Sequence, residues 1–263
     1  MRRLSTALTF LVTAAHAAVA SAGGFAAIVS PPRFELASRG GAMVRQVVQV
    51  TNRAPTLARY RVHTADFTLG ADYSVTFHDE LQPGSCRPWV ALERPEISLP
   101  GGATIRYRFE VQVPKDAAAG ECRFGILIEG EEPSLAQAGA VQIPVVGRIG
   151  VIVYVTVGDA KADLDVLGTE TVTLNGQRVP ALRVHNGGSA HTRLSGFLSG
   201  ADAQGVKYDF NPSNLPILPG ETRKVFLTPS TPGNDHPTLA FPVTVQGTLE
   251  WDKQRTELNE RFE

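Results

Sequence analysis

The two cysteines are the residues whose side-chain chemistry most needs an assignment. Cys86 and Cys122 could form a disulfide, or one of them could be a nucleophile activated by a histidine. Neither lies in a local nucleophile motif, and each is next to a turn-forming stretch, Pro83-Gly84-Ser85 or Ala119-Gly120-Glu121. In an exported protein a disulfide is the default state of such a pair, so we favour a disulfide over a catalytic thiol.

Other residues that could act in catalysis or bind a metal lack the spacing that this chemistry needs. Gly187-Gly188-Ser189-Ala190-His191 departs from the Gly-x-Ser-x-Gly nucleophile motif at its fifth residue, so it predicts a turn. The histidines that follow the first 22 residues form no His-x-x-x-His pair, which favours solvated strand positions. They are His63, His78, His185, His191 and His236. We expect no catalytic residue, no metal and no cofactor.

The N-terminus predicts export. Arg2 and Arg3 precede an apolar stretch over residues 4–19, and Ala20-Ser21-Ala22 fits a signal-peptidase site, so residues 1–22 are interpreted as a signal peptide. A retained signal anchor is the alternative. The 25 basic and 26 acidic residues leave a net charge of -1, which disfavours nucleic-acid binding. No later stretch has the roughly 20 apolar residues of a membrane helix, so we expect no stable membrane insertion.

The chain is predicted to consist of strands, because hydrophobic side chains recur at every second position through most of it. Ile105, Tyr107 and Phe109, for example, alternate with arginines, which is typical of a half-buried antiparallel strand. No segment shows a 3.6-residue period of helical length. The sequence therefore predicts an all-β fold, with an immunoglobulin-like β-sandwich of about seven strands in residues 23–158.

The second half of the chain repeats the first in shortened form. Val50 and Asn52 correspond to Val184 and Asn186 at strand ends. Ile97-Ser98-Leu99-Pro100-Gly101 corresponds to Pro216-Ile217-Leu218-Pro219-Gly220. Residues 158–163 form the only short polar joint between the halves. We therefore expect a second immunoglobulin-like domain in residues 159–263.

Residues 141–157 form an unusually long alternating stretch, with Val, Ile or Gly at every second position. At about 3.3 Å per residue it would span roughly 55 Å, much longer than an ordinary strand. We expect residues 149–157 to be a last strand that is buried on both faces. In residues 141–146, Pro144 is typical of an edge strand. This part predicts that Val141, Ile143 and Val145 are lent to another protein by β-strand addition.

Several segments together resemble the periplasmic pilus-assembly chaperones of the PapD type. They are Ser30-Pro31-Pro32-Arg33-Phe34-Glu35-Leu36, Val50-Thr51-Asn52, Arg94-Pro95-Glu96-Ile97-Ser98-Leu99-Pro100-Gly101 and Val153-Tyr154-Val155. The resemblance implies a boomerang of two immunoglobulin-like domains whose alternating strand completes the open fold of a pilin subunit. It also implies a periplasmic location and pilin-like secreted subunits as partners, and it allows an outer-membrane usher as a further partner.

The resemblance also implies two basic residues between the domains that anchor the carboxylate at the subunit's C-terminus. Arg33 matches the first. The family's second is a lysine late in the long strand, where this sequence has Val151; Arg148 is the only basic residue in that strand and the expected substitute. Residues 129–140 depart from the family as a longer loop. The alternative function is a structural or adhesive immunoglobulin-like envelope protein without chaperone activity.

Overall fold

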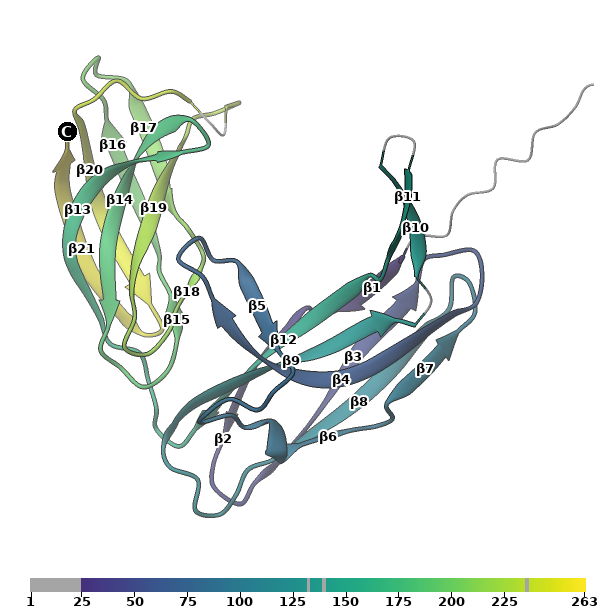
Figure 1. The fold of residues 1–263 in the computed structure, drawn as a ribbon. Coiled ribbons are helices and arrows are strands. Elements are labelled where there is room, and N and C mark those ends of the chain that lie inside the picture. The colour runs from purple at the N-terminus through teal and green to yellow at the C-terminus, as the bar shows by residue number, and fades with distance from the viewer. Residues whose placement is uncertain (1–24, 132, 139–140, 235–236) are drawn as a thin grey trace, which may run out of the picture.

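The chain forms two β-sandwich domains set at an angle, which gives the molecule the shape of a boomerang (Figure 1). This is a computed structural model that describes residues 25–131, 133–138, 141–234 and 237–263. The predicted signal peptide, Glu132 and His236 lie outside these residues. The prediction of an all-β fold with two immunoglobulin-like domains in tandem is confirmed. In the described part of the chain, no helix is long and apolar enough to cross a membrane.

Two packed sheets build the first domain. One has the order β1 (Ala27–Ser30), β3 (Met43–Asn52), β8 (Thr104–Gln112) and β6 (Val90–Leu92). The other has the order β2 (Arg33–Ser38), β12 (Arg148–Val157), β9 (Gly120–Gly130), β4 (Ala58–Leu69) and β5 (Val75–His78), with β7 (Glu96–Leu99) also paired with β4. The expected number of about seven strands was too small, because several short strands were missed.

The core of the first domain is formed by alternate residues of these strands. Val151, Val153 and Val155 of β12 are fully buried, and the rings of Phe34 and Phe109 meet edge to face at 5.1 Å. The predicted disulfide is present: Cys86, just before the short helix η1 (Arg87–Trp89), is bonded to Cys122 of β9. The cysteines therefore form a covalent link within the core, which leaves no free thiol for catalysis in the described chain.

Seven strands of the second domain are hydrogen-bonded in one continuous order. This order is β13 (Leu164–Leu174), β14 (Gln177–Asn186), β19 (Thr222–Ser230), β17 (Lys207–Pro212), β16 (Ser195–Ala201), β20 (Val243–Trp251) and β21 (Gln254–Phe262). β19 joins two layers, because residues 222–226 pair with β14 and residues 227–230 pair with β17. Two short strands, β15 (Thr192–Arg193) and β18 (Pro216–Ile217), pair separately. The buried core of this domain lies within residues 162–262, whereas that of the first lies within residues 34–157.

Asn52 and Asn186 play the same part in the two domains, as the internal repeat suggests. Both are completely buried. The side-chain amide of Asn52 donates to the carbonyl of Leu99 at 3.0 Å, and that of Asn186 donates to the carbonyl of Ile217 at 2.9 Å. Because a buried amide must be hydrogen-bonded, each asparagine fixes the end of its strand against the corresponding Leu-Pro-Gly segment.

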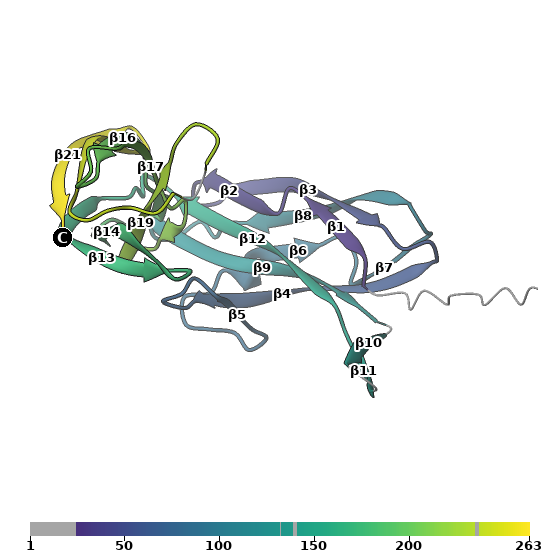
Figure 2. The ribbon, with the colours of Figure 1, turned by 90° about the horizontal axis from the view of Figure 1, so that it is seen from above.

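The long alternating stretch is divided, contrary to the expectation of one strand. Its second part is β12, which lies between β2 and β9. Its first part is β11 (Val141–Val145), which pairs with β10 (Ser134–Ala138) in a hairpin where a loop was expected. The hairpin stands away from both sheets (Figure 2). Gly147 lies at the break, where an added Cβ would be 2.1 Å from Cβ of Phe25, so only glycine fits.

Candidate functional site

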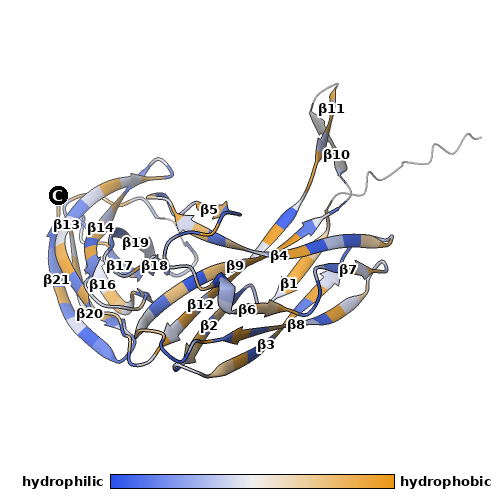
Figure 3. Cartoon of the chain, turned by 60° about the horizontal axis from the view of Figure 1, so that its bottom comes forward, coloured by the Kyte–Doolittle hydropathy of each residue, from blue (hydrophilic) through white to orange (hydrophobic). Residues whose placement is uncertain are grey.

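The β10–β11 hairpin carries a row of exposed aliphatic side chains. Val141, Ile143 and Val145 are 61%, 47% and 43% exposed, and their alternate positions place them on one side of β11. β11 pairs only with β10 among the strands that the structure describes. Figure 3 shows hydrophobic positions of this hairpin standing clear of the rest of the chain. Exposed hydrophobic strands of this kind are typical of sites of strand addition.

The first residues of β12 continue this edge. β9 pairs with β12 along its whole length, from Arg148 to Val157. On the opposite side β2 runs parallel to β12, and its pairing begins only at Arg33, opposite Ile152. Residues 148–151 therefore pair with β9 alone among the described strands. A strand from another protein that paired with this edge would lie in line with β2 and end near Arg33.

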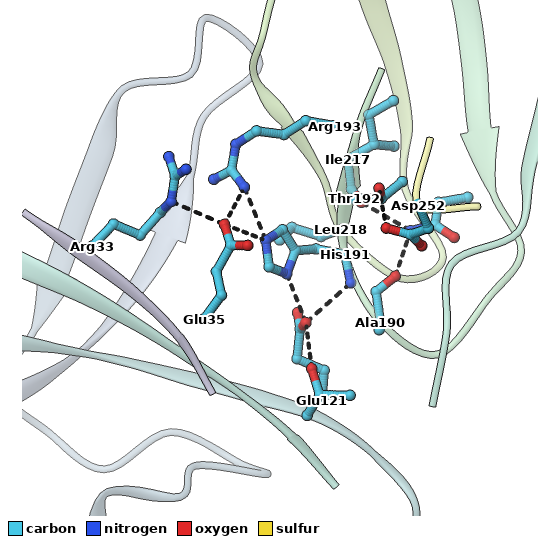
Figure 4. Close-up of polar contacts among 12 residues, drawn as sticks. Arg33, Glu35, Glu121, Ala190, His191, Thr192, Arg193, Ile217, Leu218 and Asp252 are labelled. Atoms are coloured by element: carbon cyan, nitrogen blue, oxygen red, sulfur yellow. Dashed lines mark hydrogen bonds and ion pairs between the residues drawn. The ribbon is translucent and has the colours of Figure 1, made fainter. Parts of the chain in front are cut away.

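Arg33 belongs to an ion-pair cluster at the junction of the two domains (Figure 4). Its Nε forms an ion pair with Oε1 of Glu35 at 2.9 Å. The same oxygen accepts from Nη1 of Arg193 in the second domain at 2.7 Å. Two guanidinium groups from different domains are thus paired with one carboxylate oxygen, and the contact from Arg193 is a charge-assisted hydrogen bond.

His191 and Glu121 form the second pair of this cluster. Oε2 of Glu121 lies 2.6 Å from Nδ1 of His191 and also accepts from the backbone N–H of His191 at 3.2 Å. Nε2 of His191 is 3.1 Å from Nη1 of Arg193. An arginine can only donate, so these contacts fit the tautomer with the proton on Nδ1, which donates to Glu121. Charged groups of both domains are therefore connected through one histidine.

Tyr154 lies beneath this cluster. Its ring stacks on His191 with the centroids 3.7 Å apart, and it packs with Phe67 and with Leu218 of the second domain. Burial raises the pKa of the Tyr154 hydroxyl, while the positive charge of Arg193 opposes that shift. The junction thus combines apolar packing with ion pairs.

A second contact between the domains is made by the turn between β4 and β5. The hydroxyl of Tyr73 donates to the carbonyl of Lys224 at 3.1 Å. Arg223, nearly buried and paired with Glu221, donates to the carbonyls of Leu69 and Gly70. With the cluster around Arg33, this contact ties the two domains together at two places.

The structure does not bring Arg148 and Arg33 together. Arg148 comes four residues before Ile152, the register partner of Arg33, which is roughly 13 Å along the strand. The guanidinium of Arg148 lies 5.5 Å from the ring centre of Phe77. That ring covers Gly150, where an added Cβ would be 2.4 Å from it. Two cations around one carboxylate are found at Arg33 and Arg193 instead.

Comparison with known proteins gives matches among solved structures only. No protein-family model matches the sequence, and no curated protein sequence matches it. The class 5 fimbriae chaperone CfaA is 12% identical, with a TM-score of 0.48 over 90% of this chain and 99% of that chain. The chain is similar in structure to fimbrial chaperones.

Two further structures were solved with a bound subunit. One is the complex of the SafA pilin with the SafB chaperone of Salmonella enterica, at 13% identity and a TM-score of 0.46, over 90% of this chain and 97% of that chain. The other is the CsuC–CsuE chaperone–tip subunit complex of Acinetobacter baumannii, at 11% identity and a TM-score of 0.45, also over 90% and 97%.

Sequence reasoning missed Glu35, Glu121, His191 and Arg193. Glu35 could have been found, because it follows Arg33 by two residues in a strand and so shares its face. The prediction that His191 is solvated was wrong, since its side chain is only 6% exposed and bound to Glu121. No sequence signal indicates that Arg193 meets Glu35, because the two are 158 residues apart.

Proposed function

We propose that this protein is an ATP-independent periplasmic chaperone that binds and caps pilin-like subunits by β-strand donation during assembly of a pilus or fimbria. The observation that carries this proposal is the projecting hairpin, on which Val141, Ile143 and Val145 are exposed on one side of β11. A subunit that lacks one strand exposes a hydrophobic groove and unpaired backbone groups. The backbone of β11 can hydrogen-bond with the unpaired backbone groups, and its alternate aliphatic side chains can fill the hydrophobic groove.

The open edge of β12 at residues 148–151 determines where the bound strand runs and where it stops. The strand pairs first with β11, continues along residues 148–151 of β12, and ends where β2 begins. Arg33 lies at that point and binds the C-terminal carboxylate of the subunit. Arg148 lies where β12 begins, with its guanidinium over the ring of Phe77. It is therefore near the middle of the bound strand and not near the strand's C-terminal carboxylate.

The chemistry of this binding requires no catalysis. Burial of apolar surface contributes about 25 cal/mol per Å², so capping a subunit is driven by association and needs no nucleotide. The Cys86–Cys122 disulfide supports an oxidising compartment such as the periplasm. An outer-membrane usher that accepts the capped subunit is a second expected partner.

The proposal is tested by co-expressing the tagged protein with small secreted pilin-like subunits and purifying it from the periplasm. The wild type is expected to yield a one-to-one complex, and the double variant Ile143→Asp/Val145→Asp is expected to lose it, because two charges would enter the hydrophobic groove. Phe197→Asp is the matched control, since Phe197 is 83% exposed in the second domain. If no subunit is retained by any variant, the structural or adhesive envelope protein becomes the better account.

A further inference from the structure

The open edge of β12 contains a glycine. Residues 148–151 pair with β9 alone among the described strands, and Gly150 is one of them. A glycine weakens a strand, because its backbone is the least restrained and it has no side chain to pack. This edge therefore needs support from elsewhere if it is to be extended before another strand pairs with it.

The ring of Phe77 gives that support. Phe77 belongs to β5, and two strands, β4 and β9, separate β5 from β12 in the sheet. A Cβ added to Gly150 would nevertheless lie 2.4 Å from this ring, and one added to Gly125 of β9 would lie 2.7 Å from it. The β4–β5 hairpin therefore folds back over the sheet, and the ring lies directly on two glycines. An aromatic ring that covers a glycine compensates for its missing side chain in a sheet.

The β4–β5 hairpin is fixed at both ends. At its base the carboxylate of Asp66, which is buried, accepts from the backbone N–H of Gln82 at 2.9 Å and from the hydroxyl of Ser85 at 2.7 Å. At its tip the hydroxyl of Tyr73 donates to the carbonyl of Lys224 in the second domain (Figure 1). The ring that the hairpin carries is therefore held in a defined position over β12.

Arg148 contacts the same ring. Its guanidinium carbon lies 5.5 Å from the centre of the Phe77 ring, within the range of a cation–π interaction. Glu129, the register partner of Arg148 on β9, accepts from Nη2 of Arg61 at 2.7 Å. The carboxylate opposite Arg148 is thus engaged by another arginine, while the guanidinium of Arg148 lies over the ring.

We propose that Phe77 and Arg148 are positioning residues for strand addition: the ring of Phe77, held in place by Arg148, keeps residues 148–151 extended so that a subunit strand can pair with them. The inference rests on the proposed function. It gives Arg148 a role in ordering the edge instead of in binding a carboxylate. A segment that is ordered beforehand binds more tightly, because association then does not have to restrict its backbone.

Amide hydrogen exchange of the mature protein, followed by NMR without any partner, tests the ordering. In Phe77→Ala the amides of residues 148–151 that are hydrogen-bonded to β9 should exchange about tenfold faster, because local opening becomes easier. Those of residues 153–157, which pair on both sides, should be unchanged. Arg148→Gln should accelerate the same amides about threefold, and Arg148→Lys, which keeps a cation, should not. Val75→Ala is the matched control, since Val75 also lies in β5 but is 43% exposed.

A double variant shows whether the ring acts through the glycine. The three atoms nearest to a Cβ added at Gly150 all belong to Phe77, so Phe77→Ala leaves that space free. Phe77→Ala/Gly150→Val places a strand-forming residue there and should restore slow exchange in residues 148–151. A loss of general packing would not be repaired in this way. Thermal unfolding confirms that each variant is folded, and Phe77→Leu replaces Phe77→Ala if the alanine variant is not.

Co-expression with a pilin-like subunit tests the role in strand addition. Phe77→Ala should retain about tenfold less subunit than the wild type, whereas Val75→Ala and Phe77→Ala/Gly150→Val should retain as much. Unchanged exchange in Phe77→Ala, exchange that rises equally along all of β12, failure of the double variant to restore it, or faster exchange with full subunit retention would each overturn the positioning role. No subunit retained even by the wild type would refute the proposed function instead, and the exchange of the free protein would still show whether Phe77 orders this edge.

Discussion

β11 and β12 belong to one alternating run of valine and isoleucine, yet their surroundings are opposite. Val151, Val153 and Val155 of β12 are fully buried, whereas the aliphatic side chains of β11 are about half exposed. Alternation determines on which side of a strand a residue lies, but it does not determine what covers that side. β12 is enclosed by β2, β9 and the opposite sheet. β11 lies beyond the ends of these strands, so its hydrophobic side is exposed.

The same charge placed in β12 and in β11 should have very different effects on stability. Val153→Asp puts an unpaired carboxylate into the core and is expected to lower the free energy of unfolding by about 4 kcal/mol or more. Ile143→Asp lies on the hairpin and should change it by less than about 0.5 kcal/mol. Urea unfolding measures both. Similar losses for the two variants would mean that β11 is packed as β12 is.

The disulfide should stabilise β12 and the neighbouring strand β9 but not β11. Cys122 is the register partner of Val155 on the neighbouring strand. Cys86→Ala/Cys122→Ala is expected to cost about 2–5 kcal/mol. Amide hydrogen exchange should become faster in β12 and β9 and remain the same in β11. Wild-type protein treated with reductant is the control. An effect confined to β11 would show that the disulfide stabilises the hairpin and not the packed sheet that contains β12.

The junction between the two strands depends on Gly147. In Gly147→Ala the new methyl group would meet Cβ of Phe25, which cannot rotate away, so we expect a loss of about 1–3 kcal/mol from overpacking. Gly150→Ala is the matched variant, because the atom it meets belongs to the rotatable ring of Phe77. A larger loss of stability in Gly150→Ala than in Gly147→Ala would show that the junction is not set by Phe25.

The smallest expected effect is a pH dependence that comes from Tyr154 in β12. Burial raises the pKa of its hydroxyl, so above about pH 10 the unfolded chain ionises while the folded protein stays neutral. Stability therefore falls as the pH rises through the folded pKa. Tyr154→Phe should reduce this alkaline loss in urea unfolding without removing it, because burial also raises the pKa of Tyr60 and Tyr107. An unchanged slope would show that Tyr154 ionises as it does in the unfolded chain.

The sequence was sufficient for the all-β fold and its longer strands, for the internal repeat and for the disulfide, because each leaves a signal in the sequence, but several short strands were missed. Alternation predicts strands, and Asn52 and Asn186 mark corresponding strand ends. The sequence could not predict the break between β11 and β12 at Gly147, because glycine continues the alternating pattern. The residue that Gly147 closely contacts, Phe25, is far away in the sequence.

Only some residues of the candidate site could be predicted from local patterns in the sequence. Val141, Ile143 and Val145 follow from the pattern, and their role as donor residues stays a prediction. The junction cluster could not be derived, because Arg193 and His191 reach Glu35 and Glu121 only after the two domains are placed side by side.

We propose that β11 and the first residues of β12 form the edge to which a subunit strand is added. Hydrogen exchange of the free protein and of its complex with a co-purified subunit tests this most directly. In the complex we expect slower exchange in residues 141–151, ending where β2 begins, and unchanged exchange in the rest of β12. A stable complex in which residues 141–151 exchange as fast as in the free protein would contradict it.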